Sequence, residues 1–146
     1  MVWVLLLWAV PGEGPDVRER LAEAIRDARP AEARLALTEL LAGSHARAAR
    51  AIFVSLPRAR DRAAAACAAT VGARLEYDRI DSDFSFNPFD DRHKQKQLAA
   101  TLEIIKEASR KAVDAEQVYD TLREAISSLG PEGTDVLAGE VDRTSS

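Results

Sequence analysis

Hydrophobic positions recur with the period of a helix over a long stretch of the chain, from Asn87 to Leu129. The apolar residues of this stretch fall three or four positions apart: Leu98, Leu102, Ile105, Ala108, Ala112, Ala115, Tyr119, Leu122, Ile126 and Leu129. Asn87-Pro88 is typical of a helix N-cap followed by the first helical residue, and Gly130-Pro131 is typical of a stop. The pattern therefore predicts a helical region over 88–130.

This region has two readings. A single helix would be about 63 Å long, which exceeds a domain of the preceding residues with a radius of gyration of about 12 Å. A capping-box spacing at 114–117, with Val113 and Val118 placed as a hydrophobic staple, instead indicates a second helix start. The balance slightly favours two helices, about 88–111 and 114–129, with a break near 112–114.

Three other apolar patterns have the length or period of β-strands. Val2–Val10 is continuously apolar and ends at Pro11-Gly12, which predicts a strand covered on both faces; a buried helix is the alternative, which the early turn residues disfavour. Residues 51–56 form a second apolar run that ends at Pro57. Residues 74–80 alternate between apolar and charged positions, which fits an edge strand.

Helical patterns separate these runs. One apolar stripe follows Pro15-Asp16 and consists of Val17, Leu21, Ala24, Ile25 and Ala28. Residues 31–42 suit a second helix ended by Gly43, although 34–38 alternate as a short strand would. Residues 58–71 predict an alanine-rich helix ended by Gly72.

The order of these elements predicts an α/β fold, with a small three-stranded, mostly parallel sheet and βαβ crossovers over 1–80. An acidic, Phe-bearing connector follows at 81–87, and the helical region, a long helix or a helical hairpin, occupies 88–130. Residues 131–146 are rich in Gly, Glu, Asp, Thr and Ser, which predicts a disordered tail.

Charge and cysteine content limit the classes of function that this chain can have. Residues 1–80 carry a net charge of +2 and residues 81–146 carry −6, which marks two regions, and the overall −4 argues against nucleic-acid binding. The single cysteine, Cys67, excludes an intramolecular disulfide. The apolar run 2–10 is too short to span a bilayer, so we expect a cytoplasmic protein with no membrane contact.

A ligand site is expected, if anywhere, in the loops after the first two predicted strands, because parallel strands bind ligands at their carboxyl ends. The candidate residues there are Glu13, Asp16, Ser55 and Arg58. They would make the chain a small-molecule or nucleotide-binding enzyme. However, two of them are carboxylates that oppose a phosphate, and no glycine-rich phosphate motif is present.

An acidic cluster precedes the long helix and includes Asp78, Asp81, Asp83, Asp90 and Asp91, with His93 nearby. Oxygen-rich clusters bind Mg²⁺ or Ca²⁺, but this spacing matches no calcium loop. Carboxylates at a helix start are favoured by the helix dipole without any ion. We therefore predict no metal and no cofactor.

The helical region is the more informative candidate, because no catalytic constellation is visible elsewhere. Its expected interaction residues are Phe84, Phe86, Phe89, Leu98, Leu102, Ile105, Tyr119, Leu122 and Ile126. The phenylalanines can dock either on a partner or on the domain's own core. The leading hypothesis is a non-enzymatic interaction or scaffolding module that self-associates or binds a protein partner.

Residues 2–83 also resemble, in the order of short segments, the first half of histidine phosphatases. The segments are 10–13, 37–39, 55–60 and 77–81. Pro11 stands where that family carries its phosphorylated histidine, so the resemblance implies an α/β fold without phosphoenzyme chemistry.

Overall fold

The computed structural model describes residues 16–83 and 88–145, and these ranges contain helices and no strand. The helices are α2 (Val17–Arg26), α3 (Pro30–Ala42), α4 (His45–Asp81), α5 (Pro88–Ile126) and α6 (Gly130–Ser145). The expected α/β fold is therefore wrong for this part of the chain. The predicted strand 2–10 lies outside the described residues.

The two short helices follow the sequence patterns closely. Asp16 caps α2, where its side chain accepts a hydrogen bond from the Arg18 backbone amide, and the stripe residues Leu21, Ala24 and Ile25 are buried. Pro30 is the first residue of α3, and Gly43 follows its last. The helix reading of 31–42 is confirmed, and the alternative strand at 34–38 is wrong.

Helix α4 corrects three predictions at once. The expected strands at 51–56 and 74–80, and the expected helix 58–71, are consecutive parts of one 37-residue helix. Pro57 lies inside this helix, and Gly72 does not end it. The residues that α4 buries recur with helical spacing and are mostly alanines, for example Ala59, Ala63 and Ala66, so the tertiary packing outweighs the local strand and stop signals.

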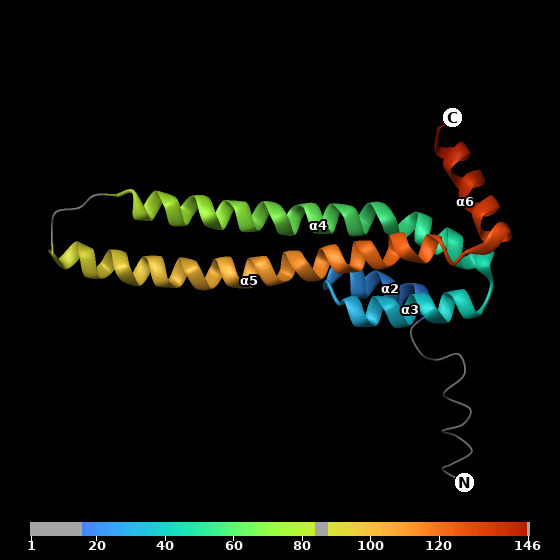
Figure 1. The fold of residues 1–146 in the computed structure, drawn as a ribbon, viewed down its shortest axis with the longest axis horizontal. Helices are drawn as coiled ribbons and strands as arrows, with labels where there is room; N and C mark the ends of the chain where they lie inside the picture. The colour runs from blue at the N-terminus through green and yellow to red at the C-terminus, as the bar shows by residue number, and fades with distance from the viewer. Residues whose placement is uncertain (1–15, 84–87, 146) are drawn as a thin grey trace, which may run out of the picture.

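Helix α5 is also continuous, over 39 residues, so the break expected near 112–114 is wrong. The capping-box residues lie within the helix because Ala112, Ala115 and Val118 are all buried against neighbouring helices. A hairpin does form, but it pairs α4 with α5 along most of their lengths (Figure 1).

The antiparallel register of this hairpin is fixed at three levels. Near the turn, the Lys94 ammonium donates hydrogen bonds to the carbonyl oxygens of Asp81 and Asp83, at 2.9 and 2.8 Å. Midway, the Cys67 thiol contacts Glu116. At the other end, the His45 ring lies beside Gly130.

The main core lies at the end of the hairpin away from the turn, which we call the base. There α2 and α3 pack against α4 and α5 around a set of fully buried side chains: Leu21, Ile52, Val118, Leu122 and Leu129. Helices α4 and α5 are each about 55–60 Å long, whereas α2 and α3 are about 15–20 Å long. The short helices therefore cover only part of the hairpin.

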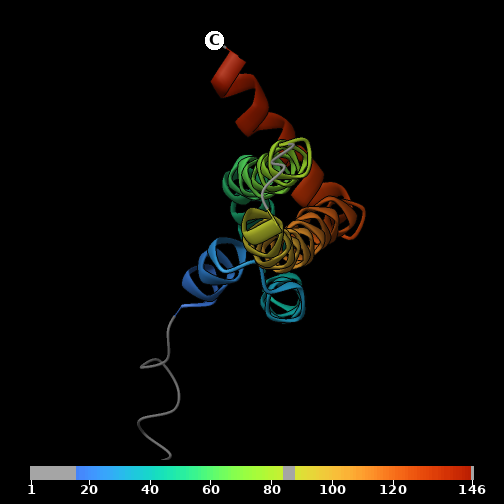
Figure 2. The ribbon, with the colours of Figure 1, turned by 90° about the vertical axis from the view of Figure 1, so that its left-hand side faces the viewer.

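Helix α6 leaves the base on another side (Figure 2). It begins at Gly130, whose φ of 69° allows the sharp turn from α5, and its Val136 and Leu137 pack against the main core. The expectation that 131–146 is disordered is wrong for 131–145, which are helical.

The segments behind the histidine-phosphatase resemblance lie within helices wherever they are described, so the α/β fold that the resemblance implies is absent there.

None of the described helices combines the length and the apolar run needed to cross a membrane.

Candidate interaction surfaces

The half of the hairpin beyond Arg62 is much less covered than the base. Helix α2 ends beside Arg62, whose Nε donates a hydrogen bond to the Arg26 carbonyl oxygen at 3.0 Å. Beyond that point α4 and α5 continue as a pair, whereas the base carries α2 and α3 on one side and α6 on another (Figures 1 and 2). We call the part beyond Arg62 the distal hairpin.

One face of the distal hairpin carries an apolar groove of about 540 Å³, which we call the distal groove. Its apolar lining comes from both helices: Ala65, Ala66, Ala69, Ile104 and Ala108. Charged residues line its rim, namely Arg62, Glu103, Glu107 and Lys111. Ile104 is 59% exposed and is the largest apolar side chain of this lining.

The other face carries a row of exposed apolar residues on α4: Ala64, Ala68, Val71 and Leu75. We call this row the distal stripe. Its spacing of four, three and four residues is that of a coiled-coil seam, and Val71 and Leu75 are 57% and 64% exposed. The stripe flanks Cys67, which contacts Glu116 of α5 on this side.

Opposite charges stand at both ends of the distal stripe. Arg60 and Asp61 lie at the end nearer the base, and Asp78 and Arg79 lie at the end nearer the turn. Arg60 and Asp78 project to one side of the stripe, and Asp61 and Arg79 to the other, because positions eighteen apart complete five helical turns. All four residues are exposed.

Two of the four expected ligand residues meet in a smaller groove between α2 and α4. Ser55 and Arg58 line this groove of about 190 Å³ with Leu21, Val54 and others. Arg18 and Arg50 also line it, and within the described residues none of its arginines pairs with a carboxylate. Ser55 is buried, Asp16 serves as the α2 cap, and Glu13 lies outside the described residues.

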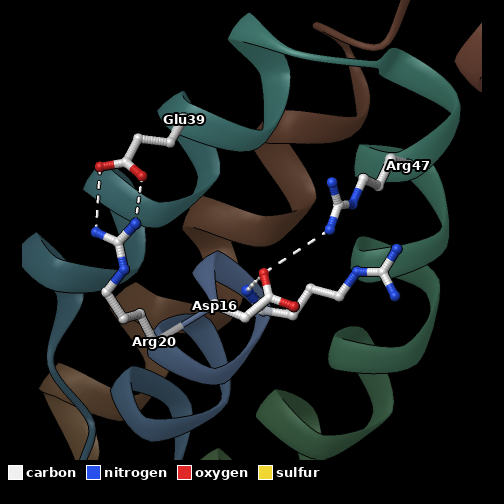
Figure 3. A network of polar contacts seen from close by, with 5 residues as sticks. Asp16, Arg20, Glu39 and Arg47 are labelled. Carbon is white, nitrogen blue, oxygen red and sulfur yellow. Dashed lines mark hydrogen bonds and ion pairs between the residues drawn. The ribbon is translucent and has the colours of Figure 1, made fainter. Parts of the chain in front are cut away.

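Asp16 belongs to a polar network that joins α2 to its neighbours (Figure 3). Its carboxylate lies 3.9 Å from Arg47 of α4, and the Arg20 guanidinium forms a two-pronged contact with Glu39 of α3 (Figure 3). The hydrogen bond to Arg20 lowers the pKa of Glu39, and the contact with Glu39 raises the pKa of Arg20. The network therefore holds α2 against α3 and α4.

The expected interaction residues of the helical region do not form one exposed face. Leu98 and Leu122 are buried, Ile105, Tyr119 and Ile126 are partly buried, and Leu102 is 42% exposed. Phe84 and Phe86, and the side chain of Phe89, lie outside the described residues. Most of the periodic pattern therefore stabilises the hairpin itself.

The acidic cluster gives no ion site in the described residues. No group of three or more His, Cys, Asp or Glu side chains is arranged there to hold a metal ion. Asp81 and Asp83 instead offer backbone carbonyls to Lys94 at the turn.

The distal stripe was missed although its spacing is visible in the sequence. A predicted helix that ends at Gly72 and a predicted strand that begins at Arg74 divide the stripe between two elements.

Comparison with family models, with curated proteins and with solved structures finds no match to this chain.

Proposed function

We propose that this chain is a non-enzymatic interaction module that associates with a second copy of itself through the distal stripe. The observation that carries the proposal is an exposed seam on α4 whose flanking charges are complementary to themselves under a two-fold rotation. A closed two-fold contact requires this self-complementarity.

The apolar part of the contact follows from the spacing. If two α4 helices pack antiparallel with the two-fold axis near 69–70, Ala64 lies opposite Leu75 of the second copy and Ala68 lies opposite Val71. Each pairing places a small residue against a larger one, which favours close interdigitation. Leu102 and Val113 of α5, 42% and 52% exposed, are further apolar residues on the hairpin surface.

The same rotation matches the charges. Arg60 comes opposite Asp78 of the second copy, and Asp61 comes opposite Arg79. The rotation keeps each side of the stripe on the same side, so like charges are not brought together. The four ion pairs would fix the antiparallel register more than they would add affinity, as expected for charges at an interface rim.

The role that fits this arrangement is scaffolding, because the contact leaves both bases free at opposite ends. The proposal places the chain in the cytoplasm, a compartment compatible with its single unpaired thiol.

The experiment is a charge exchange that preserves composition. Static light scattering coupled to size exclusion should give a dimer for the wild-type chain at tens of micromolar. The double variant Arg60→Asp/Asp61→Arg places like charges opposite each other and should be monomeric. Adding Asp78→Arg/Arg79→Asp restores opposite charges and should restore the dimer.

Two single variants complete the design. Leu75→Lys should give a monomer because it buries a charge at the seam. Leu35→Lys changes an equally exposed leucine (65%) on α3 and should leave the dimer intact. A wild-type chain that stays monomeric at every concentration, or a quadruple variant that fails to regain the wild-type mass while keeping its helical circular dichroism, would refute the proposal.

A further inference from the structure

The distal groove continues the space that α2 and α3 fill at the base. Helix α2 and the distal groove lie along the same side of α4, because α2 ends beside Arg62 and Arg62 also lines the groove. Ala28, in the turn after α2, packs with Ala63 and Ala66 where the covered part meets the open part. The groove is thus the unfilled half of an intramolecular packing surface.

The residues that precede α2 have the composition that this groove requires. Residues 2–10 read Val-Trp-Val-Leu-Leu-Leu-Trp-Ala-Val, without a single polar side chain. Such a run is strongly favoured to leave water. The groove floor is built of alanines, which leave room for large side chains such as tryptophan and leucine.

We propose that residues 2–10 of the same chain occupy the distal groove, lying over Ile104 and the surrounding alanines. This contact uses the opposite face of the hairpin from the distal stripe, so it is independent of the self-association proposed above.

The chain is long enough for this path. Asp16 lies beside Arg47, and Arg47 is about 22 Å from Arg62 and about 33 Å from Ala69 along α4. Extended, the fifteen residues before Asp16 span up to about 50 Å. Residues 11–15 read Pro-Gly-Glu-Gly-Pro, link the apolar run to the cap of α2 and, when extended, span about 17 Å of this path.

The covalent link favours this occupant over others. A short tether presents the segment to the groove at an effective concentration on the order of millimolar, which exceeds that of a second copy in dilute solution. Docking in the same chain is therefore expected to persist on dilution.

The chain carries its own reporter for the test. Its only two tryptophans are Trp3 and Trp8, so the intrinsic tryptophan fluorescence of the full chain reports on this segment alone. We expect wild-type emission at the short wavelengths of buried indole, weak quenching by acrylamide, and no change on dilution from 20 to 0.2 μM.

The perturbing variant is Ile104→Lys, with Leu35→Lys as the matched control. Both replaced side chains are about equally exposed, 59% and 65%, and both have a glutamate one helical turn away, Glu107 and Glu32. Ile104→Lys should move the emission to longer wavelength and raise acrylamide quenching at least twofold, while Leu35→Lys should change neither. Far-UV circular dichroism checks that both variants remain helical.

Several outcomes would overturn the proposal. Solvent-exposed emission in the wild-type chain, or an Ile104→Lys spectrum equal to the wild type, would show that the segment lies elsewhere. A blue shift that disappears on dilution would place the segment on a second copy, and one that appears only with phosphatidylcholine vesicles would make it a membrane-seeking segment. Leu75→Lys should leave the emission unchanged, so this result stands or falls separately from dimerisation.

Discussion

The Cys67 thiol on α4 donates a hydrogen bond to the Glu116 carboxylate on α5, with 3.4 Å between Sγ and Oε1. This hydrogen bond, with partial burial and the negative charge of Glu116, raises the pKa of Cys67. The thiol is therefore held in its neutral, unreactive form at physiological pH, because the thiolate is the nucleophile.

Replacing Glu116 should release this thiol. In Glu116→Gln the carboxylate charge is lost, so the pKa of Cys67 falls and the pH profile of alkylation by iodoacetamide moves to lower pH. Alkylation at pH 7–8 should become faster. Glu124→Gln, a charge change elsewhere on α5, should alkylate like the wild type; an unchanged profile in Glu116→Gln would contradict the assigned cause.

Gly133 allows α6 to approach the base closely. A Cβ atom there would lie 2.9 Å from the Leu129 Cβ atom and 3.1 Å from the His45 carbonyl oxygen. Gly133→Ala should therefore lower the free energy of unfolding by about 1–3 kcal/mol, as overpacking usually does. Urea denaturation measures this loss.

Gly139 provides the control in the same helix. No atom lies within 4 Å of a Cβ atom placed there, so Gly139→Ala should stabilise the chain by about 0.5–1 kcal/mol through helix propensity. Equal effects of the two substitutions would show that α6 does not pack as described.

Pro57 costs α4 a backbone hydrogen bond donor in the helix interior. Pro57→Ala should raise the free energy of unfolding by about 1–3 kcal/mol, seen as a higher midpoint of thermal unfolding. Pro131 lies in the first turn of α6, where proline is tolerated, so Pro131→Ala should change little. A less stable Pro57→Ala chain would mean that the proline ring itself packs usefully.

Leu122 and Leu102 belong to one sequence pattern but have different surroundings. Leu122 is fully buried and Leu102 is 42% exposed. Leu122→Ala should cost about 2–5 kcal/mol, whereas Leu102→Ala should cost at most about 1 kcal/mol. The two urea midpoints test whether the α5 pattern serves mainly the core of the base.

The sequence predicted those elements whose signals agree with each other. For α2, a cap, an apolar stripe and a following turn all coincide, and α3 and the start of α5 carry proline at the first helical position. The end of the α5 pattern also fell within a few residues of Ile126.

The failures arose where a local signal competed with a contact distant in sequence. The apolar run 51–56 fits a strand or a buried helix equally well, and only its packing against α2 and α5 decides. The alternation at 74–80 is a short sample of a helix that buries Ile80 and leaves Leu75 exposed. Alanine-rich seams have too little hydrophobic contrast to reveal the long α4.

The distal surfaces were hidden for the same reason. A stripe on α4 can be recognised only once α4 is known to be one helix, and the distal groove requires residues 62–69 and 103–111 to lie side by side. Ser55 and Arg58 are predicted at the end of a strand, but this part of the chain is helical; they line a groove because helical spacing also places them on one side of α4.

The hairpin register has a consequence for folding. Lys94 meets Asp81 only thirteen residues away, whereas His45 meets Gly130 across eighty-five residues. The entropic cost of closing a loop grows with the length of chain enclosed. The two helices can therefore pair progressively from the turn toward the base, and each step encloses only a little more chain. The contacts nearest the turn, where Ile80 and Leu98 are buried, therefore close the shortest loops, and the larger core of the base forms when the longest loop closes.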